Sequence, residues 1–266
     1  MPRITRRQFI ATSTGALVTA HLAAAGPPAQ TLTFAAVSDT HITGGGSVAL
    51  LSKAVDHINA DTRIRFTAVL GDMATDGKPA ELELAEAALA KLRRPWRAVP
   101  GNHDVAPGED DPFGPYKAAF GPLHWVEETG GWTFIGFNSC EMARSNVTVS
   151  EAELAWLRAQ AAGIAPGRPI ALCCHHPMNP NTAKYRIANA EAILDIFDDR
   201  NLRLCAAGHW HGNQVETRRD TLFTTSACCA TTRDNFDGTA AKGYRLYHAK
   251  PDGGLETEFV PVPPPK

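Results

Sequence analysis

An α/β fold, with helices covering a largely parallel sheet, is predicted from three features of this 266-residue sequence. Short apolar runs alternate with amphipathic segments along most of the chain. Most apolar runs are followed at once by a cluster of polar residues. Hydrophobic residues make up 44% and charged residues 20% of the chain, which excludes a disordered or collagen-like protein.

Two further properties of the composition narrow the class of protein. No uninterrupted apolar stretch reaches about 18 residues, so a multi-pass membrane protein is not expected. The formal net charge is −2, which gives no general reason to expect binding to nucleic-acid polymers.

The N-terminal segment has the pattern of an export signal. Residues 1–25 contain three arginines and no acid, followed by an apolar stretch rich in small residues. The segment TRRQFI at 5–10 resembles a twin-arginine motif, and AAA at 23–25 offers a cleavage site. We expect export by a bacterial twin-arginine machinery to the periplasm or medium. Cleavage would leave one domain, 26–266, without a stable membrane anchor and with a net charge of −5; an uncleaved N-terminal anchor is the alternative.

The six cysteines are expected to be buried thiols. An exported protein meets an oxidising compartment, so disulfides are allowed. However, the cysteines lie mainly in apolar runs, and no C-x-x-C spacing occurs. A disulfide from Cys205 to one of the adjacent pairs remains the alternative. The six are Cys140, Cys173, Cys174, Cys205, Cys228 and Cys229.

The apolar runs predict the elements of the α/β core in order. Buried strands are predicted at 32–38, 66–71, 96–101, 132–138, 169–174 and 202–208. Apolar residues at helical spacing predict helices over 51–58, 82–92 and 190–197. A capping box of Ser150 and Glu153 opens a fourth helix that runs to about Ala162.

The pattern changes after Gly212. Segments 213–217, 221–226, 243–248 and 255–260 are predicted strands without a long helix between them. We therefore expect a second, more antiparallel sheet region there, with a frayed end after Val260.

Five polar clusters stand where predicted strands end. In α/β sheets, ligands bind beyond the carboxyl ends of the strands, so these clusters are expected to meet at one rim. Each cluster alone has an ordinary explanation as a turn or as buried histidines. Their shared position and their oxygen and nitrogen donors point to metal binding. The clusters are DTH at 39–41, GD at 71–72, GNHD at 101–104, HHP at 175–177 and GHWH at 208–211.

This ordered set, across roughly residues 32–211, resembles the motifs of the calcineurin-like metallophosphoesterase superfamily. The resemblance implies a four-layer α/β/β/α sandwich with two metal ions at the rim. It implies that Asp39, His41 and His211 hold the first metal, that Asn102, His175 and His209 hold the second, and that Asp72 bridges both. It also implies that His103 is a catalytic histidine and that Asp104 orients it. His175 is preferred to its neighbour His176 because the family's ligand stands two residues before the proline.

The chemistry of such a centre fits phosphoester hydrolysis. Two divalent ions roughly 3.5–4 Å apart can bind both sides of an in-line phosphoryl displacement, and they lower the pKa of bound water toward ~7. The resemblance therefore implies attack by a metal-bridging hydroxide. His103 would hydrogen-bond the phosphate or protonate the leaving alkoxide.

Two differences from other members of the superfamily indicate which branch this chain resembles. Met73 and Ala74 follow Asp72, so the tyrosine ligand of purple acid phosphatases has no counterpart nearby. The chain also lacks room for the large added domain of 5′-nucleotidases. It resembles the compact branch that contains class III cyclic-nucleotide phosphodiesterases and glycerophosphodiesterases. We expect a phosphodiesterase for small substrates, with a broad phosphomonoesterase as the alternative. A non-catalytic exported metal-binding protein is less favoured, because every ligand position is filled.

Substrate contacts and metal identity are less defined by the sequence. Mixed nitrogen and oxygen ligation suits Fe, Mn, Zn or Co as divalent or trivalent ions. A polar segment after HHP and a later TTRDNF segment offer side chains for a phosphodiester, although both can be ordinary surface loops. Trp210 is expected to pack rather than to stack on a base. The candidate substrate contacts are His176, Asn179, Tyr185, Arg186 and Arg233.

Overall fold

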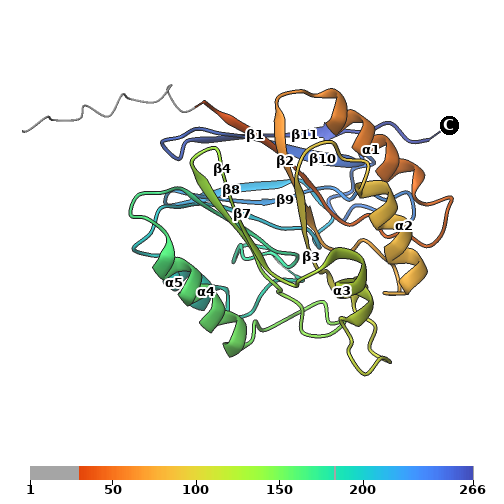
Figure 1. Cartoon of the computed structure of the whole chain (residues 1–266), viewed down its shortest axis with the longest axis horizontal. Coiled ribbons are helices and arrows are strands. Elements are labelled where there is room, and N and C mark those ends of the chain that lie inside the picture. The colour runs from red at the N-terminus through yellow and green to blue at the C-terminus, as the bar shows by residue number, and fades with distance from the viewer. Residues whose placement is uncertain (1–29, 183, 266) are drawn as a thin grey trace, which may run out of the picture.

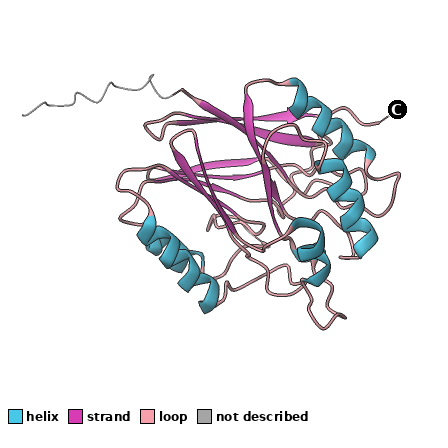
Figure 2. Cartoon of the chain, in the orientation of Figure 1, coloured by secondary structure: helices cyan, strands magenta, loops and turns pink. Residues whose placement is uncertain are grey.

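The computed structural model describes residues 30–182 and 184–265, which form two β-sheets packed face to face with helices on both outer sides (Figure 2). The first sheet consists of β1 (Leu32–Val37), β2 (Ile64–Leu70), β3 (Trp96–Val99), β10 (Gly243–Ala249) and β11 (Leu255–Pro261), in the order β11-β10-β1-β2-β3. The second consists of β4 (Trp125–Thr129), β5 (Trp132–Gly136), β6 (Ile170–Cys173), β7 (Leu202–Ala206), β8 (Gln214–Arg218) and β9 (Thr221–Thr225), in the order β4-β5-β6-β7-β9-β8. The expected export signal lies outside the described residues.

Both sheets combine parallel and antiparallel strands: antiparallel pairs lie at one edge of the first sheet (β10 and β11) and at both edges of the second (β4 and β8). In the first sheet β1, β2 and β3 are parallel, and in the second β5, β6, β7 and β9 are parallel. The carboxyl ends of parallel strands lie at one edge of a sheet, so each sheet delivers its polar loops to one end.

The helices divide between the two outer faces (Figure 1). The first sheet is covered by α1, α2 and α3, and the second by α4 and α5. None of the helices in the described part of the chain has the length and apolar character needed to cross a membrane. Their bounds are α1 Ala49–Ala60, α2 Pro79–Leu89, α3 Gly114–Phe120, α4 Glu151–Gly163 and α5 Ala190–Ile196, with a 3₁₀ turn at Asn102–Asp104.

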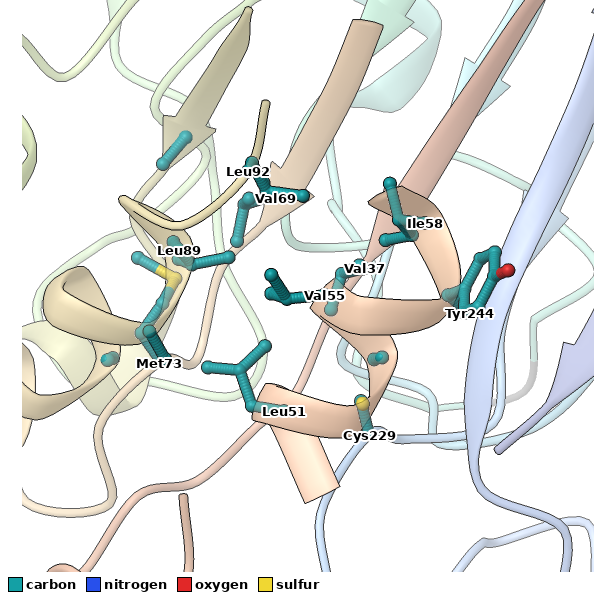
Figure 3. Packing of buried hydrophobic residues seen from close by; sticks show 14 of the residues in the cluster. Val37, Leu51, Val55, Ile58, Val69, Met73, Leu89, Leu92, Cys229 and Tyr244 are labelled. Atoms are coloured by element: carbon teal, nitrogen blue, oxygen red, sulfur yellow. The ribbon is translucent and has the colours of Figure 1, made fainter. Parts of the chain in front are cut away.

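Alternation along the strands produces three layers of core. Between the sheets, the ring of Phe34 stacks on Tyr247 at 4.6 Å and meets Phe134 edge-on at 4.8 Å. On the other face of the first sheet, Val37 packs with Val55 of α1 (Figure 3). Burying one such side chain contributes about 1.5–3 kcal/mol, so both faces of each sheet are strongly favoured to be covered. The predicted four-layer sandwich is confirmed.

The C-terminal strands do not form a sheet of their own, so that prediction was wrong. Strands β8 and β9 extend the second sheet, whereas β10 pairs with β1 and β11 extends the first sheet. The expected frayed end was also wrong for the residues described. Val262 is buried, and its backbone N–H donates to the carbonyl of Lys242 at 2.7 Å. The ammonium group of Lys53 donates to the carbonyl of Pro264 at 2.9 Å.

Strand β4 and helix α3 were not predicted, because neither segment has a strong apolar run. All six cysteines are free thiols, as the favoured interpretation predicted. Five of them are buried, and burial raises the pKa of Cys173 to about 12.

The start of α4 forms only half of the predicted capping box. The hydroxyl of Ser150 accepts a hydrogen bond from the Glu153 backbone N–H at 3.2 Å. The Glu153 carboxylate instead accepts from the backbone N–H of Asn138 at 3.2 Å. Burial raises the pKa of Glu153 from 4.5 to about 7, more than its hydrogen bond from Asn138 lowers it.

This raised pKa predicts a loss of stability with rising pH. Between about pH 4.5 and pH 7 the unfolded chain has released the Glu153 proton that the folded chain still holds. The free energy of unfolding therefore falls across this window as the pH rises. Glu153→Gln should remove this component and raise the melting temperature at pH 8, because the amide keeps an acceptor for Asn138 without a charge. Thermal unfolding of both proteins at several pH values measures this effect. If their melting temperatures changed with pH in the same way, the prediction would be contradicted.

Candidate metal centre

The loops after β1, β2, β3, β6 and β7 bring all seven predicted metal ligands together. Four of these residues have left-handed backbones, with φ of 56° at Asp39, 42° at His41, 55° at Asp72 and 63° at His209. Residues other than glycine seldom adopt this region, at a cost of order 1–3 kcal/mol each. Backbone bonds from Asp39 N to the Gly71 carbonyl and from His41 N to the Asp72 carbonyl, both 3.0 Å, hold two of the loops together.

Two motif glycines allow these loops to approach closely. A Cβ on Gly101 would lie 2.1 Å from Asp72 Oδ1, and one on Gly71 would lie 2.6 Å from His175 Nδ1. Gly71 also has a φ of +85°. Any side chain at either position would therefore push the acidic and imidazole groups apart.

The first group of donor atoms comes from Asp39, His41, Asp72 and His211. These four side chains offer atoms that all lie within 4.8 Å of one another, and all four are buried. His211 Nε2 is 3.3 Å from Asp39 Oδ1 and 3.2 Å from His41 Nε2. His41 Nδ1 is buried without a hydrogen-bond partner in the described chain.

The second group surrounds the ring of His175. Its Nε2 lies 3.0 Å from His209 Nδ1, 3.2 Å from Asn102 Oδ1 and 3.3 Å from Asp72 Oδ2. Two imidazoles, one amide oxygen and one carboxylate therefore face a common point.

Backbone carbonyls fix the tautomers of three of these histidines. A carbonyl only accepts hydrogen bonds, so the imidazole nitrogen facing it carries the proton and the other nitrogen of the neutral ring is a lone pair. In each case the lone pair points into the group of donors, as metal-binding histidines require. The donated bonds are His175 Nδ1 to Leu70 at 2.8 Å, His209 Nε2 to Ser145 at 3.0 Å and His211 Nδ1 to Asp234 at 3.1 Å.

His176 offers a ring nitrogen within 4.8 Å of those of His175 and His209, but both of its ring nitrogens have other hydrogen-bond partners. Its Nε2 donates to the carbonyl of Arg144 at 3.1 Å, and its Nδ1 is 2.9 Å from the hydroxyl of Ser139. Burial holds the pKa of His176 well below its usual range. Its proximity thus reflects packing beside the centre, and both ring nitrogens are already engaged.

Asp72 lies between the two groups. Its Oδ2 is 3.6 Å from His41 Nε2 and 3.3 Å from His175 Nε2, and its Oδ1 accepts from the His103 backbone N–H at 2.9 Å. The side chain is almost wholly buried. A single carboxylate oxygen is therefore shared by both sets of donors.

The electrostatics of this centre favour cations. Burial lowers the pKa of His211, but Asp39 and Cys228 together outweigh it and raise the pKa to about 11. Burial likewise lowers the pKa of His175, and Asp72 raises it to about 9. The carboxylates that favour a proton on the inward nitrogens of these two rings equally favour a metal ion that replaces it, so this donor set fits divalent metal ions.

His103 stands beside the first group, and its orienting partner is not the predicted one. Its Nδ1 donates to the carbonyl of Thr75 at 2.7 Å, which leaves Nε2 as the nitrogen available to a substrate. The Asp104 carboxylate instead accepts from the backbone N–H groups of Ala74 and Gly101, both at 2.8 Å. Residues 102–104 form a 3₁₀ turn, so successive side chains diverge and Asp104 fastens the loops together. The prediction that Asp104 orients His103 was wrong.

A pocket of about 370 Å³ opens over the first group. Two predicted substrate contacts, Tyr185 and Arg233, line it. Asn179 lies elsewhere, donating to Glu216 at 2.9 Å, and the exposed Arg186 donates to the carbonyl of Pro180. The structure therefore does not bring Asn179 or Arg186 to this pocket.

Phe236 and Ser145 line the same pocket and were missed in the sequence analysis. The signal for Phe236 is an isolated aromatic residue in the polar stretch TTRDNF. Trp210 packs as expected, against Phe236 at 5.4 Å and Tyr185 at 6.2 Å.

Comparisons with known proteins point to phosphoesterases. Residues 32–213 match the family model for calcineurin-like phosphoesterases. The "3',5'-cyclic adenosine monophosphate phosphodiesterase CpdA" of Escherichia coli K12 is 26% identical over 206 residues, covering 71% of each chain. The "Probable glycerophosphodiester phosphodiesterase GpdQ" of Arcobacter nitrofigilis is 28% identical over 159 residues, covering 53% of this chain and 55% of that protein.

A solved structure supports the fold. The purple acid phosphatase PPD1 from yellow lupin aligns with a TM-score of 0.66 at 11% identity, covering 88% of this chain and 52% of that one. The two-sheet sandwich, the paired donor groups and the matched motifs agree, and the family carries divalent metal ions. The chain belongs to the calcineurin-like phosphoesterase family and is a metal-dependent phosphoric-ester hydrolase.

Proposed function

We propose that this protein hydrolyses small phosphodiesters at a centre of two metal ions. The observation that carries the proposal is the position of Asp72, whose Oδ2 lies within 3.6 Å of His41 Nε2 and 3.3 Å of His175 Nε2. One carboxylate can therefore serve both metals. The proposed ligands are Asp39, His41, Asp72 and His211 for one metal, and Asn102, His175, His209 and Asp72 for the other.

The chain's own groups supply the remaining chemistry. Two bound divalent ions would acidify water and neutralise charge on the phosphoryl oxygens. His103 lines the pocket with Nε2 free of other partners, so as an imidazolium it can donate the proton on Nε2 to the leaving alkoxide and become the neutral ring. The Thr75 carbonyl accepts from Nδ1–H both before and after that transfer, so it holds the ring in one orientation. Arg233 brings a positive charge to the same pocket, where it can contact a phosphate oxygen.

A diester is favoured because the pocket extends well beyond the donor atoms. Its wall includes Ser145, Tyr185 and Thr232, none of which belongs to the donor groups. Such a wall gives a second ester substituent a surface to contact. The names of two relatives, CpdA and GpdQ, also describe hydrolysis of diesters.

A substrate panel tests the proposal. The metal-loaded enzyme should hydrolyse bis(p-nitrophenyl) phosphate with a higher kcat/KM than p-nitrophenyl phosphate, and chelation should abolish the activity reversibly. Cyclic AMP and glycerophosphodiesters complete the panel. The opposite preference would identify a phosphomonoesterase, and a metal-loaded protein inactive on every ester would be a binding protein.

His103→Ala should retain both metals but lose about 10²- to 10⁴-fold in kcat, the usual contribution of a positioned proton donor. Metal content by mass spectrometry and turnover of the diester measure the two effects separately. His57→Ala is the matched control, because His57 is exposed on α1. Turnover within twofold of the natural enzyme for His103→Ala would remove this residue from the mechanism.

Asp72→Ala should lose metal rather than only turnover, since both donor groups would lose their shared oxygen. We expect the bound metal to fall from two ions per chain to one or none, with activity lost in parallel. Asp56→Ala, an exposed aspartate on α1, should retain both ions. An intact two-metal centre in Asp72→Ala would falsify the bridging role.

A further inference from the structure

The mouth of the pocket carries an aromatic ring that the hydrolytic chemistry does not use. Phe236 is 50% exposed, although large apolar side chains are mostly buried in this chain. It lines the pocket together with Tyr185, whose ring lies 5.8 Å away. Exposed apolar surface at the edge of a polar site is a feature of ligand-binding surfaces.

The Phe236 ring is held in a fixed position despite its exposure. It stacks on the His211 imidazole at 4.9 Å with an interplanar angle of 3°, and its backbone N–H donates to the His211 carbonyl at 2.7 Å. Trp210 supports it from the side at 5.4 Å. Stacking therefore orients the ring with little remaining freedom, so a ligand that packs against it loses little further entropy.

The segment that carries Phe236 is fastened beneath the pocket by its neighbour in the sequence. The Asn235 amide donates to the carbonyl of Ala241 at 2.7 Å, and its Oδ1 accepts from Cys228 N at 3.2 Å and Lys242 Nζ at 3.1 Å. Asn235 is itself buried. The pocket side of the segment is thus a preformed surface.

Arg233 brings a positive charge to the same pocket. Its Nε is buried without a hydrogen-bond partner in the residues described. A guanidinium whose Nε has no partner among them, beside a phosphoester site, suits a phosphate oxygen. The aromatic ring and the cation therefore line one pocket together with His211, on which the ring stacks.

Building on the proposed function, we propose that Phe236 and Tyr185 form a stacking site for the nucleobase of a nucleoside phosphodiester, while Arg233 contacts its phosphate. A base is planar and offers a π-face to these rings, whereas a glycerol or alkyl substituent does not. The site would thereby select nucleoside phosphodiesters over alkyl and glycerol phosphodiesters of equal reactivity.

Two substrates with the same leaving group, one with a nucleobase and one without, measure the preference for a base. Thymidine 5′-(p-nitrophenyl phosphate) and methyl p-nitrophenyl phosphate both release p-nitrophenolate, and only the first carries a base. The natural enzyme should show the higher kcat/KM for the thymidine ester. Phe236→Ala should lower the ratio of the two kcat/KM values by about tenfold, the order expected for one base–aromatic stack, mainly through KM.

Matched variants separate stacking from disruption of the centre. Phe236→Tyr should restore the ratio, and Val215→Ala, an exposed apolar residue on β8, should leave it unchanged. Arg233→Ala should slow both substrates to a similar extent. Metal content is measured for every variant. An unchanged ratio in a Phe236→Ala protein that retains both metals would overturn the proposal.

The proposal can also be tested if the proposed function fails. Should the metal-loaded natural protein hydrolyse neither ester, the hydrolysis of diesters is excluded, and calorimetry with AMP and methyl phosphate tests the stacking site alone. Tighter binding of AMP that is lost in Phe236→Ala would support the site. Equal binding of the two ligands would exclude it.

Discussion

The carboxylate of Asp72 is the group on which the arrangement of the site depends. It is buried, it faces His41 from one loop and His175 from another, and it accepts the backbone N–H of His103 from a third. These loops follow strands of both sheets, so the face-to-face packing of the sheets is what brings them to one carboxylate. Gly101 has no room for a side chain because the same carboxylate lies against it.

Holding charged and strained groups together has an energetic cost that the core must offset. Desolvation opposes every buried carboxylate and imidazolium, and each left-handed residue adds strain. The aromatic contacts between the sheets supply the opposing free energy. Arg245 of β10 adds a polar link at the rim, donating to Ser226 at 3.1 Å and to Asn213 at 3.0 Å across to the second sheet. The loops at the carboxyl ends of the strands are therefore held rigidly, which keeps the donor side chains in place for function.

The errors of sequence reasoning share one cause. The roles of Asp104 and of the C-terminal strands were inferred from neighbours in the chain, but their partners are set by distant segments. Asp104 turns away from His103 and binds Ala74 N–H, thirty residues earlier in the sequence. Strand β10 leaves its neighbour β9 to cover an edge of β1. The Asp104 carboxylate, in a short helical turn, can reach several hydrogen-bond donors. Strand β10 can pair with an edge of either sheet. Only tertiary packing decides which partner each one takes.

The sequence alone determined the alternation of strands and helices, the polar clusters at the strand ends and the family they resemble. These features are local, because periodicity and strand-end motifs follow from the chain's own geometry. The tertiary structure decided which nitrogen of each histidine faces the centre, that His176 has no free nitrogen, and that Thr75 rather than Asp104 orients His103. It also placed Phe236 at the pocket mouth and left Asn179 away from it. The physical reason is that these outcomes depend on hydrogen bonds and contacts between loops far apart in sequence, which form only when the two sheets pack together.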